Sequence, residues 1–194
     1  ALLGHLLEDV PSRTAMSLSR MTIDLFRPVP IGVRLWIDLD VRREGRLIQV
    51  LEAVVRSEGT EHVRAHVLRI RDEDVTPGPT IAATTDDAAL LASLPGPDDL
   101  PDVGANPGIA GFLRNGAELR RTAGERSVPD CAWVRLRVPV VAGEPVRTTS
   151  LVGMSMDCVN LIGITGLPAR VTAINPDVSS HVVRPPRGEW AGLV

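Results

Sequence analysis

The sequence contains no lysine and no tyrosine, so arginine supplies all of its 21 basic side chains. The missing lysine excludes Schiff-base chemistry and a Walker-type phosphate loop, because both need a lysine amine. Three tryptophans and two phenylalanines are too few for the surfaces on which proteins stack single-stranded bases. The formal net charge of −3 also disfavours binding through phosphate neutralisation. We therefore predict no nucleic-acid partner.

Cysteines and long apolar runs are also scarce. The two cysteines, Cys131 and Cys158, cannot form a disulfide framework or a zinc quartet, and we expect reduced thiols in a cytoplasmic protein. No apolar run approaches the roughly 20 residues of a membrane span. The first residues lack the basic segment of a signal peptide, so none is expected. The four histidines are scattered, and we predict no metal site.

The composition that remains is that of a globular protein. Hydrophobic residues make up 44% of the 194 residues and charged residues 23%, which is enough to build a core. This length is typical of one large domain or two small ones.

Hydrophobic periodicity predicts a helix and then a run of strands in the first half. Leucines at helical spacing indicate a helix over residues 1–10, ended by Pro11. Alternation with a period of two then begins at Ser17. Together with one strand that is apolar on both faces, residues 46–56, it predicts an antiparallel meander of four strands. These strands cover residues 17–26, 35–41, 46–56 and 61–71.

The second half is predicted to contain the same kinds of secondary-structure element in another order. Prolines concentrated over residues 72–108 indicate a linker, with a helical turn near 86–93. Strands are expected at 117–126 and 132–141. The stretch 151–164 is apolar on nearly every side, which is typical of a buried helix. Extended segments follow at 170–174 and 178–183, and a further strand begins at Glu189.

An internal repeat links the two halves. Residues 178–185 (VSSHVVRP) echo residues 21–28 (MTIDLFRP), and each copy combines an apolar helix with a strand and an arginine-proline step. A sheet curled round a buried helix is a hot-dog unit, so we predict an α+β tandem, or double, hot-dog fold. The first unit covers 1–71 without its opening strand, the linker 72–116, and the second unit 117–194 without its closing hairpin. We thus expect a chain that is incomplete at both ends.

Several motifs resemble the double hot-dog acyl-CoA thioesterases of the thioesterase II type and their actinobacterial thioesterase-like relatives. In the first half they are DLFRPVPIG and the hairpin RREGRLIQVLEAVVRSEG. In the second half they are AWVRLRVPV, the helical MSMDCVNL and AINPDVSSHVVRPPRGEW. The resemblance covers most of residues 1–71 and 117–194.

The resemblance implies a site built from an Asp on the second helix, a Thr or Ser on the following strand, and a Gln near the C-terminus, which together hold the attacking water. Asp157 falls at the position of that Asp. Asn175 falls at the position of the hydroxyl residue. The family's Gln has no counterpart, because the chain's single glutamine, Gln49, lies in the first half.

The residues themselves support this reading and leave alternatives. An Asp among the apolar residues of 151–164 needs a partner, a raised pKa or water, and it can serve as a general base or as a structural anchor. Asn160, one turn further along, could bind a substrate carbonyl or satisfy Asp157. Asn175 precedes a proline, so it could hold the water or form an ordinary turn. Gly153 could let a thioester oxygen reach backbone N–H groups near the helix start.

We therefore expect an acyl-CoA thioesterase of fatty acid metabolism that uses water, no metal and no cofactor. A second interpretation is a non-catalytic acyl-CoA-binding or assembly protein, which the missing Gln favours. A hot-dog hydratase or dehydratase also fits the fold, but it usually needs a His with Asp or Asn near the helix start, and no such His is present. The resemblance further implies a homodimer.

Overall fold

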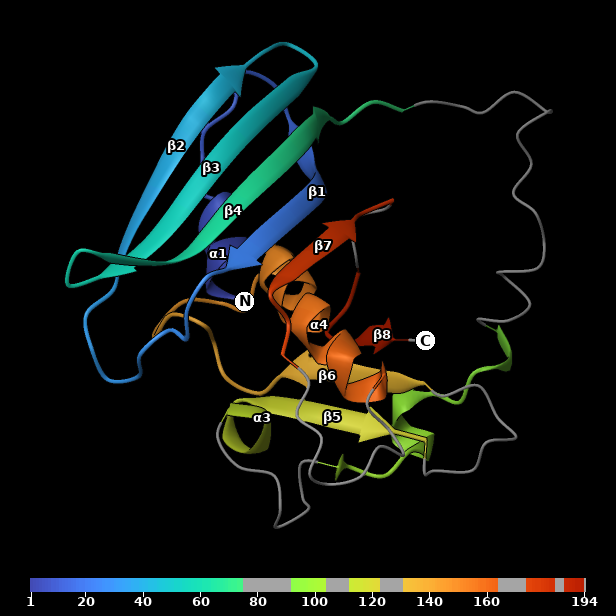
Figure 1. Ribbon diagram of the computed structural model, residues 1–194. Helices are drawn as coiled ribbons and strands as arrows, with labels where there is room; N and C mark the ends of the chain where they lie inside the picture. The colour runs from blue at the N-terminus through green and yellow to red at the C-terminus, as the bar shows by residue number, and fades with distance from the viewer. Residues whose placement is uncertain (75–91, 104–111, 123–130, 164–173, 184–186, 194) are drawn as a thin grey trace.

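The frame of the molecule consists of two antiparallel sheets with a long helix between them (Figure 1). The computed structural model describes residues 1–74, 92–103, 112–122, 131–163, 174–183 and 187–193. In the first half these form α1 (Leu2–Leu7), β1 (Met16–Leu25), β2 (Trp36–Glu44), β3 (Ile48–Ser57) and β4 (Thr60–Arg71). The predicted helix and four strands are present, but the predicted meander is wrong for the first strand, because β1 pairs with β4 and not with β2.

The second half contains short strands, short helical turns and one helix of 16 residues. They are η2 (Pro97–Asp99), α3 (Phe112–Asn115), β5 (Ala117–Arg121), β6 (Ala132–Leu136), α4 (Thr148–Gly163), β7 (Asp177–His181) and β8 (Ala191–Leu193). The strands expected at 117 and 132 are present. The second was predicted to run to 141 but ends at Leu136, just before a segment with Pro139, which cannot donate to a sheet ladder. Most of the predicted turn near 86–93, and residues 170–173, lie outside the described residues.

The larger sheet joins the two halves of the chain. Its strand order is β2-β3-β4-β1-β7, and the smaller sheet has the order β5-β6-β8. Strand β7 pairs antiparallel with β1, so that Ile23 faces Val178 and Met21 faces Ser180. The two segments related by the internal repeat are therefore neighbours in one sheet. The fold has the predicted α+β class and is compatible with a double hot-dog, whereas the division into units at 71 and 117 stays a prediction.

Helix α4 packs against both sheets. One of its stripes, Leu151, Met154 and Cys158, belongs to the core beneath the smaller sheet. A second stripe, Val152 and Met156, belongs to the core beneath the larger sheet, together with α1. The prediction of a helix buried on all sides is wrong at Asp157 and at Val159, which is 52% exposed. Asp157 lies between the two stripes and is exposed.

Candidate active site

Helices α1 and α4 pack with their backbones in close contact, because glycine stands at the crossing on both sides. A β-carbon at Gly4 would overlap the carbonyl oxygen of Thr149. A β-carbon at Gly153 would lie 3.4 Å from the Cα of Ala1 and 3.6 Å from the Cε of Met21. The carboxylate of Glu8 adds a polar link, since it accepts hydrogen bonds from the Thr149 hydroxyl (2.6 Å) and amide (3.2 Å). The crossing fixes α1 over the first turns of α4.

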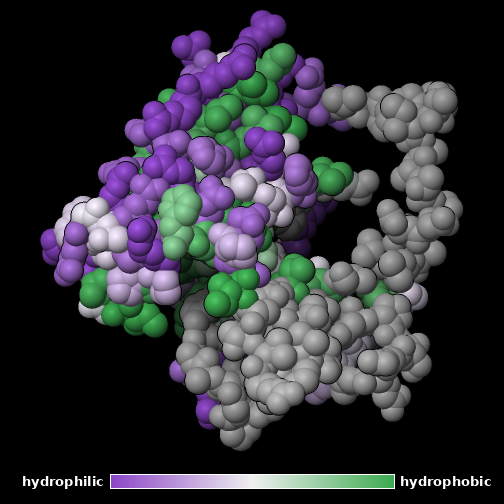
Figure 2. Space-filling view, in the orientation of Figure 1, coloured by the Kyte–Doolittle hydropathy of each residue, from purple (hydrophilic) through white to green (hydrophobic). Residues whose placement is uncertain are grey.

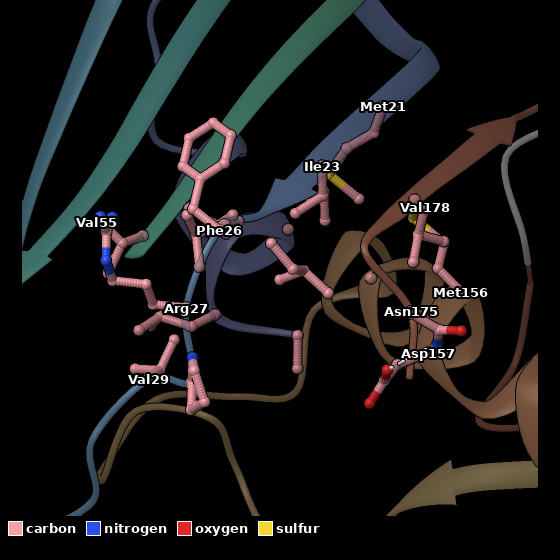
Figure 3. A pocket seen from close by; sticks show the side chains of 18 of the residues that line it. Met21, Ile23, Phe26, Arg27, Val29, Val55, Met156, Asp157, Asn175 and Val178 are labelled. Carbon is pink, nitrogen blue, oxygen red and sulfur yellow. Dashed lines mark hydrogen bonds between the residues drawn. The ribbon is translucent and has the colours of Figure 1, made fainter. Parts of the chain in front are cut away.

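A cavity of about 630 Å³ opens beside this crossing (Figure 3). Its walls come from α1, from β1 and the connection after it, from β3 and β4, and from α4 and β7. Most of the side chains that line it are apolar: Leu2, Leu3, Met21, Ile23, Leu25, Phe26, Val29, Leu35, Val55, Val63, Met156, Ile174 and Val178. A largely apolar cavity with few polar groups is the usual form of a site for a small molecule with an apolar body.

The polar end of the cavity is formed by Asp157 and Asn175, which Figure 3 shows close to one another. The Asn175 side-chain amide donates a hydrogen bond to Asp157 Oδ1 at 3.4 Å. The structure therefore brings these two predicted site residues together, and their catalytic roles stay predictions. The expectation that the carboxylate is buried among apolar groups is wrong. Asp157 is exposed, while its helical neighbours Met154 and Met156 are 4% and 7% exposed.

Comparison with known proteins connects this geometry to one group of folds. Residues 1–70 match the family model of the acyl-CoA thioesterase N-terminal domain. A proposed thioesterase II from Thermobifida fusca superimposes with a TM-score of 0.71 at 16% identity, covering 98% of this chain and 71% of its own. The acyl-CoA thioesterase II TesB2 from Mycobacterium marinum gives 0.65 at 15% identity, covering 98% and 74%.

A proposed thioesterase from Novosphingobium aromaticivorans gives a TM-score of 0.64 at 18% identity and covers 90% of this chain and 65% of its own. No curated protein matches the sequence significantly. The fold is that of the thioesterase II-type hot-dog proteins. The resemblance predicted from the sequence motifs is thus confirmed.

The other two predicted site residues, Gly153 and Asn160, have different positions. Gly153 lines the cavity. Helix α4 begins at Thr148, however, which places Gly153 in the second turn, where backbone N–H groups already bond to carbonyls one turn earlier. Asn160 lies on α4 one turn beyond Asp157, and its side chain is outside the described residues. The substrate-binding roles of both residues stay predictions.

The single glutamine of the chain has a structural role away from the cavity. Gln49 is fully buried and its amide donates to the Pro11 carbonyl (2.8 Å) and to Glu44 (2.6 Å). Its oxygen accepts from Arg69 at 2.9 Å. Gln49 therefore fixes the connection between α1 and β1 and does not replace the glutamine that the family resemblance implies near the C-terminus.

A buried contact between Ser57 and His62 lies next to the cavity residue Pro28. The sequence did not predict this contact. His62 Nδ1 lies 2.8 Å from the Pro28 carbonyl oxygen, which can only accept, so this nitrogen carries the proton. The other ring nitrogen, Nε2, then accepts from the Ser57 hydroxyl at 2.7 Å. The His62 carbonyl also accepts from the amides of Phe26 (3.0 Å) and Arg27 (3.3 Å). The β3–β4 hairpin thereby fixes the cavity residues Phe26 and Pro28.

Neither Cys158 nor Cys131 is among the described residues that line the cavity. Cys158 is 3% exposed. Burial, with the nearby Asp157 charge, raises its pKa to about 11, so the thiol is protonated near neutral pH and is a poor nucleophile. Cys131 is buried as well. This agrees with the expectation of unreactive thiols.

Neither a metal cluster nor a membrane-spanning helix is found within the described ranges. No three His, Cys, Asp or Glu side chains there lie in a group that could hold a metal ion. No helix in the same ranges is long and apolar enough to cross a bilayer.

Sequence reasoning identified the polar end of the cavity but missed most of its walls. The walls come largely from the first half of the chain, and the Asp157–Asn175 pair comes from the second half. One signal was present in the sequence. The period-two alternation of Met21, Ile23 and Leu25 places these side chains on one face of β1, and all three line the cavity.

Proposed function

We propose that this protein hydrolyses the thioester of an acyl-CoA with a water molecule positioned by Asp157. The observation that carries the proposal is the hydrogen-bonded Asp157–Asn175 pair in the lining of a largely apolar cavity. The acyl chain would lie along the apolar walls, and the thioester carbonyl would lie beside the carboxylate. The match of residues 1–70 to the acyl-CoA thioesterase N-terminal domain supports this class of substrate.

The proposed reaction is a direct attack of water on the carbonyl carbon. Asp157 accepts one proton of the water as the new carbon–oxygen bond forms. The carbon–sulfur bond then breaks, and the protonated Asp157 returns that proton to the leaving sulfur, so that CoA departs as a thiol. The products are a carboxylic acid and free CoA. Asn175 orients the carboxylate through one N–H of its amide. The second N–H of the same amide is suited to the carbonyl oxygen on which negative charge develops.

The first turn of α4 is a less suitable oxyanion site. The Thr149 amide donates to Glu8, and the amides of Ser150 and Leu151 donate to the Arg147 carbonyl. These donors are therefore already engaged by the protein. We therefore infer that the Asn175 amide stabilises the oxyanion.

The proposal is tested by release of free CoA from acyl-CoAs of increasing chain length. We expect the wild type to release CoA, and Asp157→Asn to do so about 10²–10⁴-fold more slowly, which is the usual contribution of a general base. Asp177→Asn is the matched control, because it removes an equally exposed carboxylate from the nearby strand β7 and should leave the rate unchanged. Equal rates for wild type and Asp157→Asn would overturn the role of Asp157.

A second candidate function is acyl-CoA binding without catalysis. The amide of Asn175 stands where the family resemblance implies a hydroxyl, and no glutamine lines the cavity among the described residues. In that case the protein would bind a non-hydrolysable acyl-CoA analogue but release no CoA. Calorimetric titration with the analogue, run beside the CoA assay, separates the two functions.

The same proposal includes a cellular setting. We infer a cytoplasmic protein of fatty acid metabolism that acts as a homodimer of tandem hot-dog units, with residues 72–116 joining units 1–71 and 117–194. Sedimentation of the purified chain tests the dimer.

A further inference from the structure

The connection between β1 and β2 exposes an unusual number of apolar side chains. We define the rim loop as residues 26–36. Five apolar residues in it are well exposed: Phe26 (53%), Val29 (38%), Ile31 (99%), Val33 (45%) and Trp36 (50%). Figure 2 shows hydrophobic atoms gathered at the lower left of the molecule, over this connection. Single exposed apolar residues are normal, but a contiguous group marks a site of interaction.

The rim loop also forms one side of the acyl cavity. Phe26, Arg27, Pro28, Val29 and Leu35 line the cavity. A molecule that covers the loop therefore covers this edge of the cavity too. We therefore expect the loop to bind a surface in which apolar substrates are found.

The charges in this region have one sign. Between Leu25 and Ile37 the only charged residues are Arg27 and Arg34, both of which are exposed. Asp38, which follows, is paired with Arg56. The whole chain has a net charge of −3, so this is a local positive region on an acidic protein. It complements a negatively charged surface.

The base of the loop is fixed and its tip projects. The backbone amides of Phe26 and Arg27 donate to the His62 carbonyl, and Pro28 accepts from the buried His62 ring. At the tip, Gly32 has a φ of 78°, a conformation that glycine adopts without strain. Ile31, beside this turn, is almost completely exposed. The loop therefore presents its apolar tip without first having to unfold.

We propose that the rim loop docks on an anionic phospholipid surface. Its apolar side chains enter the interface between headgroups and acyl chains, Arg27 and Arg34 contact the phosphates, and Trp36 lies at the headgroup level. Apolar side chains combined with arginine and tryptophan are typical of interfacial binding. Given the proposed thioesterase function, docking would bring the cavity edge to the surface in which long-chain acyl groups partition. Binding itself needs no hydrolysis.

The experiment is co-sedimentation of the whole chain with vesicles of phosphatidylcholine containing phosphatidylglycerol. We expect binding that weakens with added salt and falls sharply on vesicles of phosphatidylcholine alone. Ile31→Glu should weaken binding by about tenfold or more, because burial of such a side chain is worth at least that factor. Arg34→Gln should weaken binding only to the anionic vesicles.

The matched control is Val183→Glu, which adds the same charge at a residue that is 91% exposed and outside the loop. It should bind as the wild type does. Neither side chain is packed in the core, so circular dichroism should show both variants folded. No binding by the wild type, or equal binding by wild type and Ile31→Glu, would overturn the proposal. If Ile31→Glu instead dissociated a dimer in sedimentation velocity, the loop would belong to an interface between two copies, and the proposal would equally be wrong.

The vesicle assay is independent of the proposed hydrolysis. Asp157→Asn should bind vesicles as the wild type does. If the wild type binds vesicles but releases no CoA, the proposed function fails and the docking surface stands. If it releases CoA from dissolved acyl-CoA but does not bind vesicles, the docking surface fails alone.

Discussion

At the scale of the residue, the central finding is the environment of Asp157. The sequence places this Asp among Met154, Met156 and Val159, and this pattern predicts a buried, desolvated carboxylate. In the structure Asp157 is exposed and contacts Asn175. The difference arises because α4 uses the stripes on either side of Asp157 for its two cores. A carboxylate at an accessible cavity edge can contact water, which is what the proposed reaction requires of Asp157.

The amide at position 175 gives a prediction for substitution. Asn175→Val removes the donor to Asp157 at similar volume, and a hydrogen bond to a charged group is worth about 1.5–3 kcal/mol. We expect CoA release about 10–100-fold slower with Asn175→Val. Asn175→Thr, which introduces the hydroxyl group that the family resemblance implies, should keep most of the activity. Similar rates for the Val and Thr variants would rule out a donor role for this side chain.

The buried thiols give a prediction about reactivity and pH. Because the pKa of Cys158 is raised to about 11, Ellman's reagent should not label it in the folded protein at neutral pH, but should label it after unfolding in guanidinium. A raised pKa in the folded state keeps the thiol protonated while the unfolded chain ionises. The free energy of unfolding should therefore fall as pH rises from about 9 to about 11, by up to ~1.4 kcal/mol per pH unit. Cys158→Ala should remove that part of the slope in urea titrations.

At the scale of the element, the sequence predicts the kinds of element well and their partners less well. Period-two alternation identifies β1 to β4, because each strand packs one face on the core, as the buried Val63, Ala65 and Val67 of β4 illustrate. The internal repeat also identifies two related strands. Their direct pairing in one sheet could not be predicted, since hydrophobic periodicity reports which face is buried and carries no information about the neighbour. The Ser57–His62 contact was missed for the same reason, because it depends on the turn that brings β3 and β4 together.

The crossing of α1 and α4 gives a prediction at this scale. Gly4→Ala places a methyl group on the Thr149 carbonyl oxygen, so the two helices must separate. We expect a loss of about 1–3 kcal/mol in the free energy of unfolding, as for overpacking of a core. Gly96→Ala is the control, because its nearest neighbour, an oxygen of Asp99, would lie at 3.4 Å, which is ordinary contact. Equal urea midpoints for the two variants would contradict the close crossing.

At the scale of the whole molecule, the site depends on both halves of the chain. The apolar walls belong mainly to the first half, and Asp157 and Asn175 belong to the second. Strand β7 and the α1–α4 crossing hold the halves together. The sequence motifs predicted the α+β class and the polar pair, since these depend on local pattern and resemblance. The cavity walls depend on the packing of distant segments, which local pattern does not specify.

Acid stability is a further property of the whole molecule. Glu118, 5% exposed, accepts from Arg120 and Arg135 at 2.7 Å each. Burial acts to raise the pKa of Glu118, but these hydrogen bonds outweigh it, and the pKa is lowered. A lowered pKa in the folded state stabilises the protein above the unfolded pKa, near 4.5, and this contribution is lost as pH falls through the folded value.

Glu118→Gln should therefore lower the free energy of unfolding at pH 7 by about 2 kcal/mol, with a smaller difference from wild type near pH 3. Glu189→Gln is the control, since Glu189 approaches the same Arg135 at 3.5 Å but is 81% exposed. Urea unfolding at the two pH values measures both variants. A difference that stays constant with pH would exclude the ionised carboxylate as the cause.

The most direct test of the account is a single-turnover reaction of the wild type with an acyl-CoA in water enriched in heavy oxygen. After the turnover, mass spectrometry locates the label in the fatty acid and in the peptide that contains Asp157. If Asp157 positions the attacking water, the label enters the carboxylic acid and Asp157 carries none. Heavy oxygen in the Asp157 carboxylate would reveal an anhydride formed by that side chain, and absence of any labelled acid would mean that no hydrolysis occurs; either result contradicts the account.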